Sequence, residues 1–318
     1  MIAVLAGGVG AARFLRGAVR LNAPLTAIVN TADDTVLHGL HISPDLDTVT
    51  YTVAGAIDPE RGWGLANESW NAMEALARFE SVTPADSLGA PRWFNLGDRD
   101  LATHFYRTAR LREGASLTEV TTEIAEAWDV PCAIVPMTND EVRTLVTLAE
   151  DCIAGSAGDE ITFQEYFVKF RHDVRVASVR FAGSDTAKPS FLSTIHDAQK
   201  VIIAPSNPIV SIGPLRSLNG VDETLAARRD DVVAISPIVG GKALKGPADR
   251  LMVELGMQPS VVGVAELYRD ICATLIIDEC DAHLVDEVEA LDMNCIVTDT
   301  IMSSPEVTER LAVTCGVR

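Results

Sequence analysis

The first thirty residues alternate between strand and helix patterns, and this constrains the fold more than any other feature of the chain. Residues 2–6 form a short apolar run that a glycine-rich turn terminates. Residues 11–21 then carry apolar side chains at helical spacing, and residues 25–30 form a second apolar run. Such a strand–helix–strand opening builds a parallel sheet, with ligand sites at the carboxyl ends of its strands. The opening therefore predicts an α/β fold.

The same alternation returns in the second half of the chain. Short apolar runs indicate strands at residues 130–137, 174–181, 201–204, 232–235, 273–277 and 295–298. Stretches with helical spacing lie between or after them, at residues 220–230, 246–256, 283–291 and 306–313. This order of elements favours a Rossmann-like α/β fold with a mostly parallel sheet.

The segment between the two halves has a helical pattern and no clear strand. Its predicted helices are residues 47–57, 66–80, 99–111 and 116–128. Ser116 and Glu119 stand at capping-box spacing before the last of them. We predict a core made of residues 1–46 and 130–318, with residues 47–129 as a helical insert packed on it. No Pro/Gly/Ser-rich linker divides the chain, so we expect no flexible joint.

Composition excludes several classes of partner. The formal net charge is -19, which argues against a general nucleic-acid binder because that affinity depends on basic side chains. We find no apolar run approaching the ~18–20 residues of a membrane helix, and no signal-peptide pattern at the start. The six cysteines include no C-x-x-C pair and are expected to be reduced. We therefore expect a cytoplasmic protein without nucleic-acid or membrane partners.

The glycine turn after the first strand is a candidate phosphate site. Gly7, Gly8 and Gly10 let the backbone approach a ligand closely, and the following helix presents free N–H groups. The pattern is neither a P-loop nor a full dinucleotide fingerprint, because no Gly-Lys-Ser/Thr follows and position 13 is arginine. A tight turn with a purely structural role is the alternative.

A dense group of polar side chains follows the second predicted strand. It contains Asn30, Asp33, Asp34, His38, His41, Asp45 and Asp47. Asp45 and Asp47 are two residues apart and suit Mg²⁺, which takes one or two carboxylates together with phosphate oxygens. A solvated acidic loop that caps a helix is the alternative. Ordinary loop or packing roles for His38 and His41 also stay open.

A third group combines Asp98, Arg99, Asp100 and His104 near the start of a predicted helix. Asp98 is predicted to be the N-cap residue. An arginine in the first helical turn is unfavourable for the helix dipole, so Arg99 is a candidate ligand contact. An exposed ion pair is the alternative.

Two further turns follow strands in the second half. The first contains Ser206, Asn207 and Ser211 between fixed prolines, and the second contains Gly241 and Lys242. Both suit a nucleotide or another anion, and structural or solvated turns are the alternatives. No Ser/His/Asp or Cys/His set stands at a usable spacing. Since several such turns follow predicted strands, we expect one large site along one sheet edge that binds a phosphorylated ligand.

These turns resemble the 2-phospho-L-lactate transferase family, together with its actinobacterial phosphoenolpyruvate transferase relatives. The matching stretches are residues 6–10, 30–34, 38–48, 97–100, 102–104, 117–119, 135–137, 163–165, 205–208, 211–214, 236–238 and 245–248. They span nearly the whole chain in order. The chain departs from the family pattern at Ala11 and Arg13 in the glycine turn, which puts the fit of the donor in question rather than the turn itself.

The resemblance implies a Mg²⁺-dependent transferase, often a homodimer. The ribityl hydroxyl of the deazaflavin Fo would attack a guanosine diphospho-acid, giving coenzyme F-420-0, or its dehydro form, and GMP. Lactate, enolpyruvate and glycerate remain open as the acid, and a non-catalytic nucleotide-binding regulator of the related non-deazaflavin group is the alternative function.

The resemblance also assigns roles to residues. The expected catalytic residues are Asp45, Asp47 and Arg99, with Asp45 and Asp47 at the metal. The expected Fo contacts are Asp47, Arg99, Asp98 and His41. The expected donor contacts are Gly7, Gly8, Gly10, Asn30, Ser206, Asn207, Ser211, Gly241 and Lys242. Which carboxylate holds the metal and which acts on the hydroxyl stays open.

Overall fold

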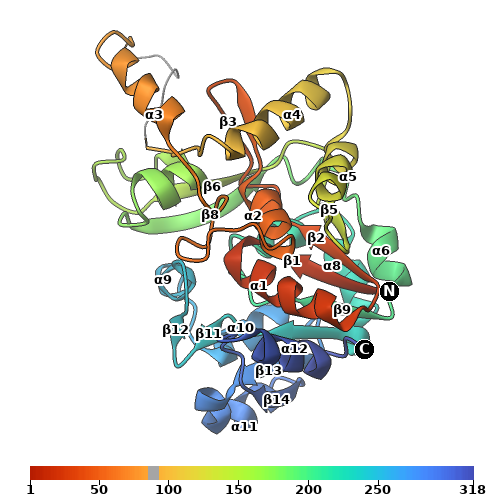
Figure 1. The fold of residues 1–318 in the computed structure, drawn as a ribbon. Helices are drawn as coiled ribbons and strands as arrows, with labels where there is room; N and C mark the ends of the chain where they lie inside the picture. The colour runs from red at the N-terminus through yellow and green to blue at the C-terminus, as the bar shows by residue number, and fades with distance from the viewer. Residues whose placement is uncertain (85–92) are drawn as a thin grey trace.

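A seven-stranded parallel sheet forms the centre of the molecule (Figure 1). The computed structural model describes residues 1–84 and 93–318. The strands lie in the order β14-β13-β10-β9-β1-β2-β5, and all neighbours are parallel. Their bounds are β1 (Ile2–Ala6), β2 (Leu25–Val29), β5 (Ala133–Pro136), β9 (Lys200–Ile203), β10 (Val232–Ile235), β13 (Thr274–Asp278) and β14 (Asn294–Thr298). The predicted Rossmann-like α/β fold is confirmed.

Helices cover both faces of this sheet, which explains the continuous apolar runs of its strands. On one face pack α1 (Gly8–Ala18), α2 (Pro44–Val53) and α12 (Pro305–Thr314). On the other pack α6 (Leu192–Asp197), α7 (Gly213–Arg216), α8 (Val221–Ala226), α9 (Ala248–Glu254) and α10 (Val261–Tyr268). Successive side chains alternate between the two cores, as Val4 and Leu5 do in β1. A shorter helix, α11 (Val285–Glu289), precedes β14.

Helices also form where the middle segment predicts them. They are α3 (Asn71–Leu76), α4 (Asp100–Arg112) and α5 (Leu117–Ala127), in addition to α2. The capping box of α5 is confirmed, since Ser116 and Glu119 each bond the other's backbone N–H. Figure 1 shows α3 and α4 beyond the upper end of the central sheet. The division into a core and an insert of residues 47–129 remains a prediction.

Small antiparallel sheets accompany the central one. A hairpin joins β3 (Thr35–Leu37) and β4 (Leu40–Ile42), and a second joins β11 (Ile238–Val239) and β12 (Lys242–Ala243). A three-stranded sheet contains β7 (Glu160–Thr162), β6 (Arg143–Leu148) and β8 (Val176–Ala182) in that order. The strand predicted at 174–181 thus exists as β8, but it pairs antiparallel with β6, which the sequence patterns did not indicate.

The chain reverses its direction of travel across the sheet beside β1. It continues from β1 to β2 and β5 on one side, then returns to β9 on the other side and proceeds outward to β14. The loops that follow β1 and β9 therefore diverge from a common point. Open α/β sheets bind ligands in the crevice at such a switch point.

None of the helices in the described ranges is both long enough and apolar enough to cross a membrane.

Candidate active site

A cavity of about 750 Å³ lies at the switch point. Loops after β1, β9 and β10 line it together with α2, α4 and the segment before α4. Of the residues predicted for the site, the cavity is lined by Gly7, Gly8, Gly10, Asp45, Asp47, Ser206, Asn207 and Ser211. The structure thus brings together the glycine turn, the start of α2 and the loop after β9. Of these, Gly7 and Ser206 are in contact although they are 199 residues apart in the chain.

The glycine turn packs against the loop that follows β9. The Ser206 hydroxyl donates to the Gly7 carbonyl at 2.8 Å and accepts from the Gly7 amide at 3.3 Å. A Cβ atom on Gly10 would lie 2.1 Å from the Pro205 carbonyl oxygen, so only glycine fits there. Gly8 has φ of +68°, a conformation that glycine adopts without strain. This close approach shapes a backbone-lined wall at the start of α1.

Asn30 lies behind the cavity and organises two buried carboxylates. Its side-chain amide donates to Asp45 Oδ2 at 3.0 Å and to Asp33 Oδ2 at 3.2 Å. Burial, together with the charge of Asp45, raises the pKa of Asp33 well above its usual range. Burial raises the pKa of Asp45 to about 6, against hydrogen bonds from Asn30 and the Gly8 backbone. Burial therefore favours the protonated form of both carboxyl groups.

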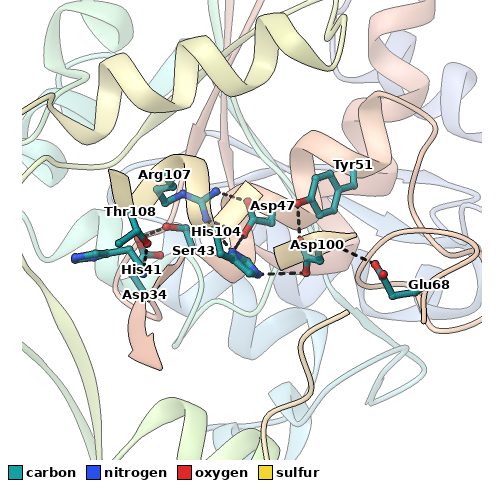
Figure 2. A network of polar contacts seen from close by, with 10 residues as sticks. All are labelled: Asp34, His41, Ser43, Asp47, Tyr51, Glu68, Asp100, His104, Arg107 and Thr108. Carbon is teal, nitrogen blue, oxygen red and sulfur yellow. Dashed lines mark hydrogen bonds and ion pairs between the residues drawn. The ribbon is translucent and has the colours of Figure 1, made fainter. Parts of the chain in front are cut away.

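Asp47 is held from behind by Arg107. The two terminal nitrogens of Arg107 each donate to one oxygen of Asp47, and Nη1 lies 3.1 Å from Oδ2 (Figure 2). Burial opposes the charge of Arg107, but the ion pair keeps its pKa above the ordinary value. Beside this pair, the Ser43 hydroxyl donates to Asp34 at 2.6 Å, and burial raises the pKa of Asp34.

Asp47, Asp100 and His104 form a group that could hold a metal ion. One ligand atom from each lies within 4.8 Å of the others. His104 Nδ1 is 3.8 Å from Asp47 Oδ2, and its Nε2 is 3.4 Å from Asp100 Oδ2 (Figure 2). Tyr51 donates its hydroxyl to Asp100 Oδ1 at 2.6 Å. Burial alone would raise the pKa of Asp100, but the charge of nearby His104 and the hydrogen bond from Tyr51 lower it.

Asp98 and Arg99 lie outside the cavity lining and take part in a reciprocal pair of helix caps. Asp98 accepts from the backbone N–H groups of Asn71 and Ala72 at 2.9 Å each, so it caps α3 and not α4. Glu68 in turn accepts from the N–H groups of Arg99 and Asp100 at 2.6 and 3.2 Å, at the start of α4. These contacts fix the entry of α4, which carries Asp100 into the cavity. The contacts of Asp98 and Arg99 with Fo remain predictions.

The other predicted residues also lie off the cavity lining. His41 is exposed in the middle of β4, and Figure 2 shows its ring directed away from Asp47 and Asp100. Gly241 lies in the turn between β11 and β12, and Lys242, the first residue of β12, is exposed. Lys245, three residues later, lines the cavity instead, as does Arg13 of α1. Burial and the charge of Arg13 lower the pKa of Lys245.

Aromatic side chains form much of the remaining wall. The cavity is lined by Trp63, Trp93, Phe94, Phe163 and Phe167. The rings of Phe163 and Phe167 stack with centroids 5.5 Å apart. Arg61 lies over the rings of Trp63 and Trp70, at 5.4 and 5.3 Å from their centroids. A planar heterocycle can stack on such a wall.

Tyr51 and Arg107 are site residues that the sequence patterns missed. A signal for Arg107 was present, because Asp100, His104 and Arg107 are spaced so that they share one face of a helix. Thr103 and Thr108 are buried on the same helix, so a polar face of α4 packs inward. The sequence gives no comparable signal for Tyr51, because an aromatic residue at this position of α2 looks like an ordinary core residue.

The family follows from comparison with known proteins. A model of the 2-phospho-L-lactate transferase CofD family matches residues 2–308. The chain belongs to the CofD family. The match spans both the central sheet and the segments that line the cavity, so this CofD-family chain is a transferase whose substrates are small molecules.

Several curated CofD relatives are similar over nearly their full length. The phosphoenolpyruvate transferase of Mycobacterium ulcerans (strain Agy99) is 38% identical over 325 residues, which cover 98% of this chain and 96% of that protein. The phosphoenolpyruvate transferase of Kitasatospora aureofaciens is 38% identical over 317 residues, covering 98% and 95%. A crystal structure of protein BH3568 from Bacillus halodurans has a TM-score of 0.61 at 15% identity, covering 99% of this chain and 98% of that one. That likeness shows the fold alone.

Proposed function

We propose that the protein transfers a phosphorylated three-carbon acid from a guanosine diphospho-acid to the terminal ribityl hydroxyl of Fo, releasing GMP and forming coenzyme F-420-0 or its dehydro form. The observation that carries this proposal is the joining of two features in one cavity. The close-packed glycine turn offers backbone to a nucleotide, and the buried acidic group lines the same cavity. Both stand at the switch point of the sheet, where such ligands bind.

Phosphoenolpyruvate is the acid that we put first. Its support is the name shared by relatives that are 38% identical to this chain. The Gly7–Ser206 contact gives the donor a rigid backbone wall, and Arg13 and Lys245 supply positive charge for its phosphates. The aromatic wall that contains Phe163 and Phe167 suits the flat deazaflavin ring.

The residues present fit a hard divalent cation, and we propose Mg²⁺. Asp47 and Asp100 offer carboxylate oxygens, and His104 is 1% exposed with an Nε2 atom that lacks a hydrogen-bond partner among the described residues. Two carboxylates are the usual protein share of a Mg²⁺ site, with phosphate oxygens and water completing it. Asp45, which the sequence pairs with Asp47 at the metal, lies outside this group of ligand atoms. When bound, the cation would offset charge on the diphosphate.

Asp45 is the residue that we propose as proton acceptor. It lines the cavity beside the glycine turn, and its pKa of about 6 lies nearer neutral pH than that of an ordinary carboxylate. In the reaction, the ribityl oxygen bonds to the phosphorus that carries the acid, and the bond from that phosphorus to the GMP oxygen breaks. The hydroxyl proton passes to Asp45, and GMP leaves with the bonding electron pair. The homodimer remains a prediction from the family resemblance, and the cytoplasmic location remains a prediction from the sequence.

The test is direct. Purified protein is incubated with Fo, Mg²⁺ and the lactyl, enolpyruvyl or glyceryl diphosphoguanosine donor, and mass spectrometry follows the deazaflavin phosphodiester and GMP. We expect product with at least one donor, and the highest kcat/KM identifies the acid. Binding of guanine nucleotide without product from any donor would contradict the transferase and favour a nucleotide-binding regulator.

A further inference from the structure

One face of α4 carries three polar side chains, of which two reach the cavity and one lies behind them. Asp100, His104 and Arg107 lie on this face, because residues four and three apart stack along a helix. Asp100 and His104 line the cavity, whereas Arg107 does not and is only 2% exposed. Arg107 therefore cannot reach a substrate, and any effect on the reaction has to pass through the residues that it contacts.

The contact of Arg107 with Asp47 fixes the orientation of a carboxylate. Each terminal nitrogen of the guanidinium donates to a different oxygen of Asp47, and Nη1 also lies 3.4 Å from His104 Nδ1. A planar guanidinium that donates to both oxygens sets the plane of the carboxylate as well as its distance. The lone pairs of Asp47 that do not accept from Arg107 stay available on the side of His104 and Asp100.

Burial of this charge is costly, and stability alone gives a poor reason for it. A buried ion pair contributes little more than apolar side chains of the same volume, because both ions lose their hydration. Arg107 is the largest of the fully buried side chains in the described ranges, and its Nε has no hydrogen-bond partner there. An ion pair with only a structural role, and with an Nε that lacks a hydrogen bond, would add less to the stability of the fold than apolar side chains would.

We propose that Arg107 is a positioning residue, which holds Asp47 at the angle where the Asp47–Asp100–His104 group binds a divalent cation. This inference rests on the proposed function, since that group is its proposed metal site. Lysine at position 107 would keep the positive charge but offer a point donor instead of a planar one. The proposal therefore separates the geometry of the guanidinium from its charge.

The chain supplies a matched control one turn further along the same helix. Arg110 also makes a two-pronged contact, donating to Glu123 from Nε at 3.0 Å and from Nη2 at 2.8 Å. It does not line the cavity. The variants to compare are Arg107→Lys, Arg107→Ala and Arg110→Lys, each checked for folding by circular dichroism and thermal melting.

The first readout is binding of Mn²⁺ by the substrate-free protein, followed by electron paramagnetic resonance. We expect Arg107→Lys to weaken Mn²⁺ binding by about 10- to 100-fold and Arg110→Lys to leave it unchanged. The second readout is turnover of Arg107→Ala in millimolar guanidinium chloride, which we expect to restore kcat in this variant and to leave kcat of Arg110→Lys unchanged.

Unchanged Mn²⁺ affinity and kcat in folded Arg107→Lys would overturn the positioning role. If the wild-type protein binds no Mn²⁺, the proposed metal site fails separately, and the guanidinium experiment decides for Arg107. Restored turnover then supports a role in positioning Asp47, and no restoration in folded Arg107→Ala overturns it.

Discussion

The hydroxyl of Ser206 bonds both the carbonyl and the amide of Gly7, at 2.8 and 3.3 Å, and so joins the loops of β1 and β9 across the switch point of the sheet. Both residues line the cavity, and Ser206 is 3% exposed. The wall offered to the donor is therefore set by one side chain from a loop about 200 residues away in the chain.

Replacing Ser206 with alanine should loosen this wall. The change leaves the buried polar groups of Gly7 without their partner, at a cost of about 1–3 kcal/mol in the free energy of unfolding. We expect KM for the donor to rise more than kcat falls, because the contact shapes binding and not the reacting atoms. Ser178→Ala is the control, since that hydroxyl bonds Thr147 at 2.8 Å on an exposed face. Equal KM values in the two variants would contradict the role of Ser206.

The raised pKa of Asp45 predicts that the stability of the protein depends on pH. Its pKa is raised from 3.8 to about 6 by burial, so between these values the folded state holds a proton that the unfolded state has lost. The contribution of Asp45 to stability is therefore greatest below pH 3.8 and falls as pH rises to about 6, by about 3 kcal/mol.

Asp45→Asn tests this in metal-free buffer, because the amide resembles the protonated acid. Urea unfolding should give wild type and variant similar stability near pH 4, whereas the variant should be the more stable one at pH 7, by up to about 3 kcal/mol. Parallel curves across that range would mean that Asp45 titrates normally. Activity is expected to be lost in the variant at every pH.

Tyr51→Phe should affect the acidic group with little loss of packing. The ring would keep its edge contact with Trp128, at 5.3 Å between centroids, while Asp100 would lose the 2.6 Å bond from the hydroxyl. Because that bond helps to lower the pKa of Asp100, its carboxylate should become easier to protonate. We expect Mn²⁺ binding to weaken by about 10-fold or more.

Tyr106→Phe is the matched control for Tyr51. Its hydroxyl donates to Glu123 at 2.8 Å on the exposed side of α4, so Mn²⁺ binding should stay at the wild-type value. Equal losses in both variants would show that the effect comes from a general disturbance of α4 and not from Asp100.

The sequence predicts the central sheet well because its strands are buried on both faces, and continuous apolar runs such as that of β9 carry a strong signal. It does not predict β6, in which buried Thr144, Val146 and Leu148 alternate with outward side chains and one buried position is polar. The site shows the same division. The glycine turn is local, whereas the contact of Arg107 with Asp47 joins residues 60 apart and depends on how α4 packs.

The local pattern does not indicate which lysine lines the cavity. Lys242 follows two glycines at a strand end and resembles an anion site, but those glycines build a hairpin that leaves it exposed. Lys245 stands beyond β12 and lines the cavity. The turn geometry that decides between them is set by the pairing of β11 with β12, which no single-residue signal indicates.

The caps of α3 and α4 lead to a prediction in which two different substitutions act alike. Glu68 accepts from the N–H groups of Arg99 and Asp100, and thereby fixes the start of the helix that carries Asp100. Glu68→Ala removes this cap and should lower the free energy of unfolding by about 1 kcal/mol. Gly97→Ala should do the same indirectly, because the new Cβ would lie 2.1 Å from the Cγ and Cδ atoms of Glu68 and would displace that side chain.

Both variants should therefore weaken Mn²⁺ binding, although neither residue lines the cavity. The double variant decides whether they act through one contact. If Gly97→Ala acts by expelling Glu68, the double variant should lose no more stability than Glu68→Ala alone, since the cap is lost only once. Additive losses in urea unfolding would instead show that Gly97 supports this region independently of the Glu68 cap.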